Sequence, residues 1–217
     1  VLFNSRSHFE AFFEELPRFL RRMPEFRPRW ALQAIRERSA VLTPGCRLPA
    51  PAGPGAGPGG SEGASLPPVG EVPLVLWNHR WEFDKRPAAF FSALAEVERR
   101  GGEFRLALLG ENYQKVPKEL LAARERWPQR IVQYGYVEDR AAYLEWLRRA
   151  AVVVSTAAQE NFGIAVVEAV AMGCLPLLPR RLSYPELIPA RFHGQCLYED
   201  EEQLVGMLEA ALRELPA

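Results

Sequence analysis

The chain has 217 residues, 48% of them hydrophobic and 25% charged, and a formal net charge of zero, a composition typical of a globular protein. This length allows one good-sized domain, or one domain with a fragment of another. The balanced charge gives no general attraction to nucleic acid or membranes. No apolar run approaches the roughly 20 residues that span a bilayer.

Residues 1–43 have the pattern of a small α/β fragment. A strand end is expected at Val1–Asn4, a helix from a cap at Ser5 or Ser7 to about Arg22, a second helix at about Pro28–Arg38 and a strand at Ala40–Thr43. Such a piece is too small to close a core by itself. The chain begins without Met inside a predicted strand, and charged residues break up any signal-peptide core. We therefore expect the sequence to be a fragment of a longer protein.

Residues 44–70 predict a flexible linker. Fifteen of these 27 positions are Gly or Pro, and such a segment buries too little apolar surface to offset its ordering entropy. Gly55, Gly57 and Gly60 match the dinucleotide-binding fingerprint formally, but no strand precedes them and Pro58 lies among them. We attribute this match to composition.

Residues 71–217 alternate between short apolar strands and helices. Strands are predicted at Leu74–Trp77, Phe104–Leu109, Ile131–Tyr134, Ala151–Ser155, Leu175–Leu178 and Gln195–Tyr198. Helices are predicted at Pro87–Arg100, Pro117–Trp127, Arg140–Ala150, Gly163–Met172, Tyr184–Ile188 and Glu201–Leu215. This order predicts an α/β fold, a Rossmann-like doubly wound parallel sheet. Ligands of such sheets bind at the carboxyl ends of the strands, so the loops after the strands are the candidate sites.

The loop after the first of these strands carries Arg80 and Lys85 and ends at Pro87, a favourable first residue for a helix. Two cations near a helix N-terminus suit a diphosphate. A solvated loop with Arg80–Glu82 or Asp84–Lys85 ion pairs is an equally open interpretation. The neighbouring Trp77 and Trp81, if exposed, could stack on a base. The alternative is that one of them packs under the loop.

The loop after the fourth strand carries Glu160 and Gly163, and Glu168 follows inside an apolar helix. Gly163 allows close approach of a ligand to the backbone. A carboxylate among apolar residues requires a partner, which ribose hydroxyls would provide. The alternative is an ordinary capping Glu160 and a surface Glu168.

These residues carry a family resemblance. Glu160-x7-Glu168 with Phe162-Gly163 between them, followed by Gly173-Cys-Leu-Pro176, is similar to the signature of the family 4 retaining glycosyltransferases. Arg80-x4-Lys85 resembles the diphosphate clamp of that family. The resemblance covers residues 71–217 and implies the C-terminal, nucleotide-sugar-binding lobe of a GT-B enzyme, whose two Rossmann-like lobes face a cleft. Residues 1–43 would then be the remnant of the N-terminal, acceptor-binding lobe.

The resemblance also implies roles for individual residues. Arg80 and Lys85 would bind the donor diphosphate, Glu168 the ribose, and Glu160, the candidate catalytic residue, the transferred sugar. The backbone of Phe162, Gly163 and Ile164 would contact sugar and phosphate, and that of Tyr136 and Val137 would contact the base. Retention of configuration by front-face attack is implied, with Glu160 as the alternative nucleophile.

A narrower resemblance concerns the run Leu76-Trp-Asn-His-Arg-Trp-Glu-Phe-Asp-Lys-Arg-Pro87. It is similar to the corresponding stretch of the tRNA-queuosine α-mannosyltransferases, which implies transfer of mannose from GDP-mannose to queuosine in tRNA. A family 4 enzyme with another donor and a lipid or glycan acceptor is the first alternative. A non-catalytic nucleotide-binding or interaction module is the second, and a fragment without its acceptor lobe is expected to have little activity alone.

No metal or other cofactor is expected. The chain has no Asp-x-Asp motif of the kind that holds a metal in single-lobe transferases. It has no Gly-Lys-Ser/Thr phosphate loop, and it lacks a credible glycine fingerprint for NAD. Three scattered cysteines fit neither a disulfide framework nor a zinc site, so a cytoplasmic location is expected.

Overall fold

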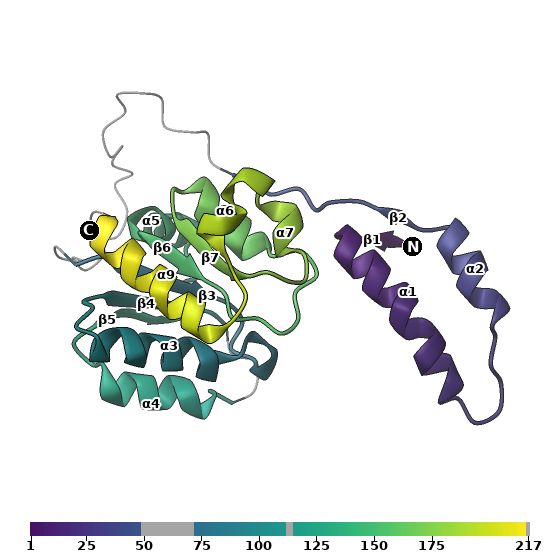
Figure 1. The fold of residues 1–217 in the computed structure, drawn as a ribbon, viewed down its shortest axis with the longest axis horizontal. Helices are drawn as coiled ribbons and strands as arrows, with labels where there is room; N and C mark the ends of the chain where they lie inside the picture. Colours follow the sequence, from purple (N-terminus) through teal and green to yellow (C-terminus); the bar gives the residue numbers. More distant parts are fainter. Residues whose placement is uncertain (49–71, 112–114, 216–217) are drawn as a thin grey trace.

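The structure is a computed structural model that describes residues 1–48, 72–111 and 115–215 (Figure 1). Most of the predicted linker, including its glycine motif, lies outside these ranges. The elements follow in the order β1 (Leu2–Phe3), α1 (Arg6–Arg21), α2 (Trp30–Glu37), β2 (Ala40–Val41), β3 (Leu74–Asn78), η1 (Phe83–Lys85), α3 (Pro87–Arg99), β4 (Arg105–Leu109), α4 (Lys118–Arg126), β5 (Ile131–Gly135), α5 (Arg140–Arg149), β6 (Val152–Val154), α6 (Ile164–Ala171), β7 (Leu175–Pro179), α7 (Tyr184–Leu187), η2 (Ala190–Phe192), α8 (His193–Cys196), β8 (Leu197–Tyr198) and α9 (Glu201–Glu214).

The main sheet has six parallel strands in the order β5-β4-β3-β6-β7-β8. The chain starts in the middle at β3, runs outward through β4 to β5, and returns to the other side of β3 with β6. The predicted α/β fold with a doubly wound parallel sheet is therefore confirmed. The direction reverses between β3 and β6, and ligands of open α/β sheets bind at such a switch point.

Helices cover both faces of this sheet (Figure 1). Alternate strand residues such as Val75 and Trp77 pack against α3, α4 and α9 on one face. The residues between them, such as Leu76, pack against α5 and α6 on the other. Because each central strand buries both sets of side chains, its sequence is continuously apolar. No helix in the described ranges is both long and apolar enough to cross a membrane.

The predicted boundaries of the elements agree with the structure to within a few residues. Several helices begin at a short polar side chain that caps the first turn. Asp139 accepts a hydrogen bond from the Ala142 N–H at the start of α5, and Asp200 accepts one from the Gln203 N–H at the start of α9. Ser5 caps α1 in the same way. Side-chain oxygens satisfy backbone donors that the first helical turn leaves unpaired.

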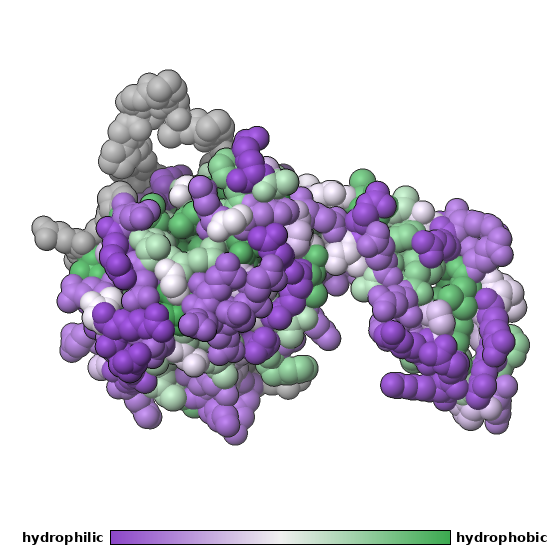
Figure 2. Space-filling model, viewed as in Figure 1, coloured by the Kyte–Doolittle hydropathy of each residue, from purple (hydrophilic) through white to green (hydrophobic). Residues whose placement is uncertain are grey.

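The N-terminal segment forms a small unit beside the main sheet (Figure 1). β1 pairs in parallel with β2, and Phe3 packs among the rings of Phe9, Phe12 and Phe13. Much of its apolar surface stays exposed, including Trp30 at 71%, and Figure 2 shows apolar patches among charged side chains there. The segment therefore buries few side chains of its own.

The interpretation that Trp77 and Trp81 are exposed for base stacking is wrong, whereas the alternative, in which one of them packs beneath the loop, agrees with their burial. Trp77 is fully buried because it points from the central strand β3 into the core, where it stacks on Phe90 of α3. Trp81 is 5% exposed and packs edge-on against Tyr134 of β5. The exposed ring of this loop belongs to Phe83, which is 90% exposed.

Gly110, directly after β4, allows the loops after β3 and β4 to touch. A Cβ atom there would overlap the carbonyl oxygen of His79 and lie 2.7 Å from two ring atoms of Trp81. The backbone N–H of Trp81 donates to the Glu111 carbonyl at 3.0 Å, so the two loops are also hydrogen-bonded. Glycine is the one residue without the atom that would separate them.

Gly110→Ala is expected to lower the free energy of unfolding by about 2 to 3 kcal/mol, because backbone and a buried indole must both shift. The matched control is Gly206→Ala in α9, where a Cβ meets nothing within 4 Å. This second change should raise stability by about 0.5 to 1 kcal/mol through helix propensity. Urea unfolding of the two variants measures both effects, and equal stabilities would contradict the packing argument.

Candidate functional site

The two loops at the switch point are joined by backbone and side-chain hydrogen bonds. The Ala158 N–H donates to the Asp84 carbonyl at 2.7 Å. The Thr156 hydroxyl lies 2.8 Å from the Lys85 carbonyl and 3.1 Å from that of Arg86. Arg86 has φ +50°, a left-handed conformation that a side chain rarely adopts, and the contacts with Thr156 hold it there.

Lys85 lies between these loops and is 5% exposed. Its ammonium group is 2.7 Å from the Gln159 carbonyl, 3.1 Å from Asp84 and 3.4 Å from Glu160. Three acceptors match the three N–H donors of an ammonium group. The structure thus brings the two predicted residues Lys85 and Glu160 together, and a diphosphate at Lys85 would compete with these protein oxygens.

Arg80, in contrast, lies at the surface. Its side chain is 58% exposed and lies 3.5 Å from Glu82. With the pair between Lys85 and Asp84, both ion pairs of the alternative interpretation are therefore present. Arg80 also lines a cavity of about 180 Å³ together with Tyr136 and Val137. Arg80 therefore lies beside the two residues predicted to contact the base.

Glu168 is held by a polar network on the other face of the sheet. Its carboxylate accepts hydrogen bonds from Arg140 and from the Tyr143 hydroxyl, the latter at 3.1 Å. Asn78, the last residue of β3, donates to the Tyr143 oxygen and to the Ala165 carbonyl. Burial and the nearby Glu168 carboxylate raise the pKa of Tyr143, which keeps its proton as the donor in this bond. Each carboxylate oxygen still has a lone pair for a further donor.

Gly163 occupies the N-cap of α6 with φ +94°, a conformation that favours glycine. The Phe162 N–H donates to Glu160 at 3.3 Å, so this carboxylate folds back over its own turn. Ile164 is 44% exposed at the start of the helix. The predicted contacts of Phe162, Gly163 and Ile164 with sugar and phosphate, like the other assigned roles, stay predictions.

His79 is buried behind these loops and was not singled out from the sequence. Its Nε2 atom lies 3.3 Å from the Val154 carbonyl, and its ring meets Trp77 edge-on. Burial, reinforced by the Lys85 ammonium, lowers the pKa of His79 to about 4. The imidazole is therefore neutral at pH 7.

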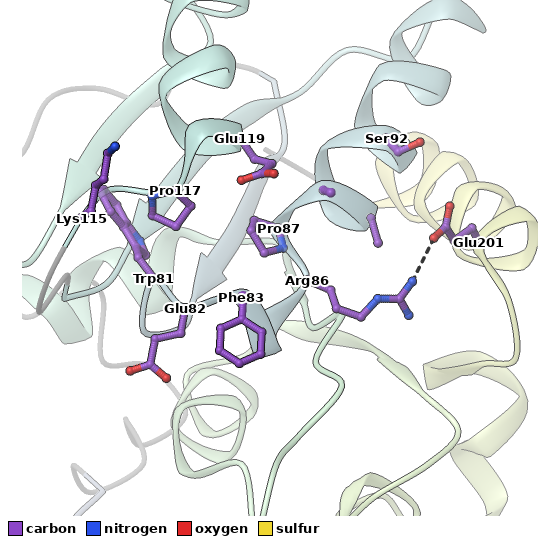
Figure 3. Close-up of a pocket in the computed structure, with 12 residues that line it drawn as sticks. Trp81, Glu82, Phe83, Arg86, Pro87, Ser92, Lys115, Pro117, Glu119 and Glu201 are labelled. Atoms are coloured by element: carbon purple, nitrogen blue, oxygen red, sulfur yellow. Dashed lines mark hydrogen bonds and ion pairs between the residues drawn. The ribbon is translucent and has the colours of Figure 1, made fainter.

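A separate cavity of about 810 Å³ opens on the other side of η1 (Figure 3). Phe83 and Arg86 line it, and Arg86 pairs there with Glu201 at 3.5 Å. None of the predicted site residues lines this cavity. We place the candidate site at the smaller cavity, because Arg80, Asn78 and Tyr143 converge there.

Comparison with known proteins gives the family. The family described as "Glycosyl transferases group 1" matches residues 63–214. The chain belongs to this family. A second family, described as "tRNA-queuosine alpha-mannosyltransferase N-terminal", matches residues 1–46 of this chain.

One relative is similar over most of the chain, and two solved structures share its fold. The chain is 32% identical over 193 residues to the tRNA-queuosine alpha-mannosyltransferase of Drosophila melanogaster, covering 87% of the chain and 49% of the relative. The chain thus spans about half the length of that protein. Among solved structures it is similar to the lipopolysaccharide outer core galactosyltransferase WaaB, with a TM-score of 0.64 and 18% identity, and to a trehalose-6-phosphate synthase, with 0.63 and 16%. In each case 98% of the chain covers 52% of the structure, which shows a shared fold.

Sequence reasoning missed the residues that support the predicted site. Asn78 is the last residue of β3 and His79 directly follows it. Their place at the carboxyl end of a central strand, where ligands of such sheets bind, could have identified them from the sequence. Arg140 and Tyr143 lie one helical turn apart on α5, but only the tertiary structure brings them to Glu168. In the described residues, no group of three or more His, Cys, Asp or Glu side chains is arranged to hold a metal.

The neutral, buried His79 predicts a loss of stability in acid. The unfolded imidazole binds a proton near pH 6.5, whereas the folded one does so only near pH 4. The unfolded state therefore binds more protons between these values, and the free energy of unfolding falls as the pH falls. About 2 kcal/mol should be lost between pH 7 and pH 5. Urea unfolding at both pH values should show this loss shrinking in His79→Gln but persisting in His193→Gln.

Proposed function

We propose that this chain is the donor-binding part of a retaining glycosyltransferase that transfers mannose from GDP-mannose to queuosine in tRNA. The observation that carries the proposal is that Arg80, Lys85 and Glu160 lie on the two loops at the switch point, where Lys85 meets Glu160, and that Glu168 lies on helix α6 directly after the second loop. The identity to the Drosophila enzyme supports the choice of tRNA as acceptor, and a tRNA substrate favours a cytoplasmic location.

The exposed Arg80 is the residue that can meet the donor diphosphate without breaking a buried contact. As the bond between sugar and diphosphate breaks, negative charge develops on the leaving oxygens, and a fixed guanidinium stabilises it. Lys85 adds a second positive charge close by. We propose that these two cations make a metal unnecessary for departure of the diphosphate.

Glu160 lies beside Lys85 and would contact the transferred sugar. Its carboxylate is 20% exposed and lies 3.4 Å from the Lys85 ammonium group. We propose that the acceptor hydroxyl attacks the same face of the sugar from which the diphosphate departs, since Glu160 is engaged with Lys85. Attack by Glu160 itself would give a covalent intermediate, which mass spectrometry of the trapped protein would detect.

Direct titration tests the donor. The purified chain is titrated calorimetrically with GDP-mannose, GDP, UDP-glucose and NAD. At about 100 times the dissociation constant, a ligand should add about 2.7 kcal/mol to the free energy of unfolding. Preference for guanine nucleotides would justify testing tRNA with a protein that carries an acceptor lobe. Preference for UDP-glucose would favour the alternative family 4 enzyme, and binding of none would favour the interaction module.

Arg80→Ala should weaken GDP binding about tenfold or more, because a charge-assisted contact to the diphosphate is lost. The matched control is Arg148→Ala on α5, which removes an arginine of similar exposure (52%) that pairs with Glu145. Calorimetry with GDP compares the two variants. Equal affinities in both would contradict a role for Arg80 at the diphosphate.

Glu168 is tested by the ribose hydroxyls themselves. The wild-type chain should bind GDP about tenfold more tightly than 2′,3′-dideoxy-GDP, since a hydrogen bond to a carboxylate is lost with the hydroxyls. In Glu168→Ala the two ligands should bind equally. A preference that survives in the variant would show that another group contacts the ribose.

A further inference from the structure

The turn that carries Glu160 is held by side chains from three separate parts of the chain. Lys85 donates to the Gln159 carbonyl at 2.7 Å, and the buried Ser183 donates to the Phe162 carbonyl at 2.9 Å. Ser5 donates to the Asn161 carbonyl between them, also at 2.7 Å. The carbonyl groups of Gln159, Asn161 and Phe162, which flank Glu160, are thus each held by a side-chain donor. Ser5 is the donor that comes from the N-terminal segment.

Ser5 uses its hydroxyl group twice. It accepts a hydrogen bond from the His8 N–H at 3.1 Å as the N-cap of α1, and its proton is directed to Asn161. It is 4% exposed. A hydroxyl group can donate and accept at the same time, which an Asp cap at neutral pH cannot do.

A second contact holds the same end of α1 to the main domain. Glu186 of α7 accepts from the Arg6 N–H at 2.9 Å and from the Ser7 N–H at 2.6 Å. These N–H groups have no partner inside the helix, and the helix dipole favours a carboxylate at this end. Figure 1 shows α7 beside the start of α1. The same helix α7 packs over Gly163, because Tyr184 and Leu187 are the side chains nearest to a Cβ placed there.

We propose that Ser5 and Glu186 are positioning residues that fix the Glu160 turn through the N-terminal segment. The start of α1 is fastened on one side to Asn161 and on the other to Glu186, and both lie next to the turn. The geometry of the sugar-contacting part of the site then depends on the segment to which α1 belongs, whereas that of Arg80 and of the base-contacting residues does not. This inference rests on the proposed function for its link to the sugar.

The first test compares Ser5→Ala and Ser5→Asp in the 217-residue chain. Asp keeps the helix cap but removes the donor to Asn161. The matched control is Ser39→Ala, which removes a hydroxyl–carbonyl bond of 2.6 Å to Ile35 within the same segment. Without ligand, hydrogen exchange of the amides at 160–163 should speed up about five- to tenfold in both Ser5 variants and stay unchanged in the control. Wild-type exchange in Ser5→Asp would reduce Ser5 to a helix cap and overturn the proposal.

Glu186 gives an independent comparison. Glu186→Ala should speed exchange of the same amides, and Glu186→Gln should restore part of the protection because its amide oxygen still accepts. Exchange at 160–163 that is the same in wild type and Glu186→Ala would contradict the role of this residue.

The second test separates sugar from nucleotide. Ser5→Ala and Ser5→Asp should weaken binding of GDP-mannose about five- to tenfold and binding of GDP by clearly less. An equal loss for both ligands would show only general destabilisation and would overturn the positioning role. A wild-type chain that binds neither ligand would overturn the proposed function instead, and the exchange rates would then decide alone whether Ser5 and Glu186 hold the turn.

Discussion

One buried ammonium group organises the candidate site. Lys85 comes from the loop after β3 and reaches oxygens of the loop after β6, 74 and 75 residues further along the chain. A buried charge is costly unless it is paired and hydrogen-bonded, and here Gln159, Glu160 and Asp84 supply the acceptors. The two loops are therefore fixed relative to each other at the point where the sheet changes direction. Lys85 is thus held by oxygens of the protein, whereas Arg80 lies at the surface and pairs with Glu82.

In the second polar network the central group is a carboxylate, that of Glu168, rather than an ammonium group. Glu168 lies on a helix that is apolar on most sides, and its charge is balanced by Arg140 and Tyr143 from the neighbouring helix α5. Asn78 ties this network to the end of β3. Both networks thus meet at the central strand, one on each side of its carboxyl end.

The N-terminal segment is a structural partner of this site as well as a neighbour. It reaches the Glu160 turn through Ser5 and reaches α7 through the backbone at the start of α1. The core of the N-terminal segment is small, so these hydrogen bonds contribute considerably to holding the segment against the main domain. The start of α1 is thus the contact that joins the N-terminal segment to the loop after β6 and to α7.

Local pattern by itself determined the alternation of strands and helices, the helix caps and the loops that carry the chemistry, because each depends on residues within a few positions of one another. The resemblance added the family, which the comparisons confirmed. The tertiary structure decided what those side chains touch: Lys85 is buried rather than exposed to a ligand, Trp77 and Trp81 are in the core, and Ser5 bonds to a residue 156 positions away. The physical reason is that such contacts depend on strand order and on which face each side chain occupies, and periodicity in one segment carries no information about its neighbour in space.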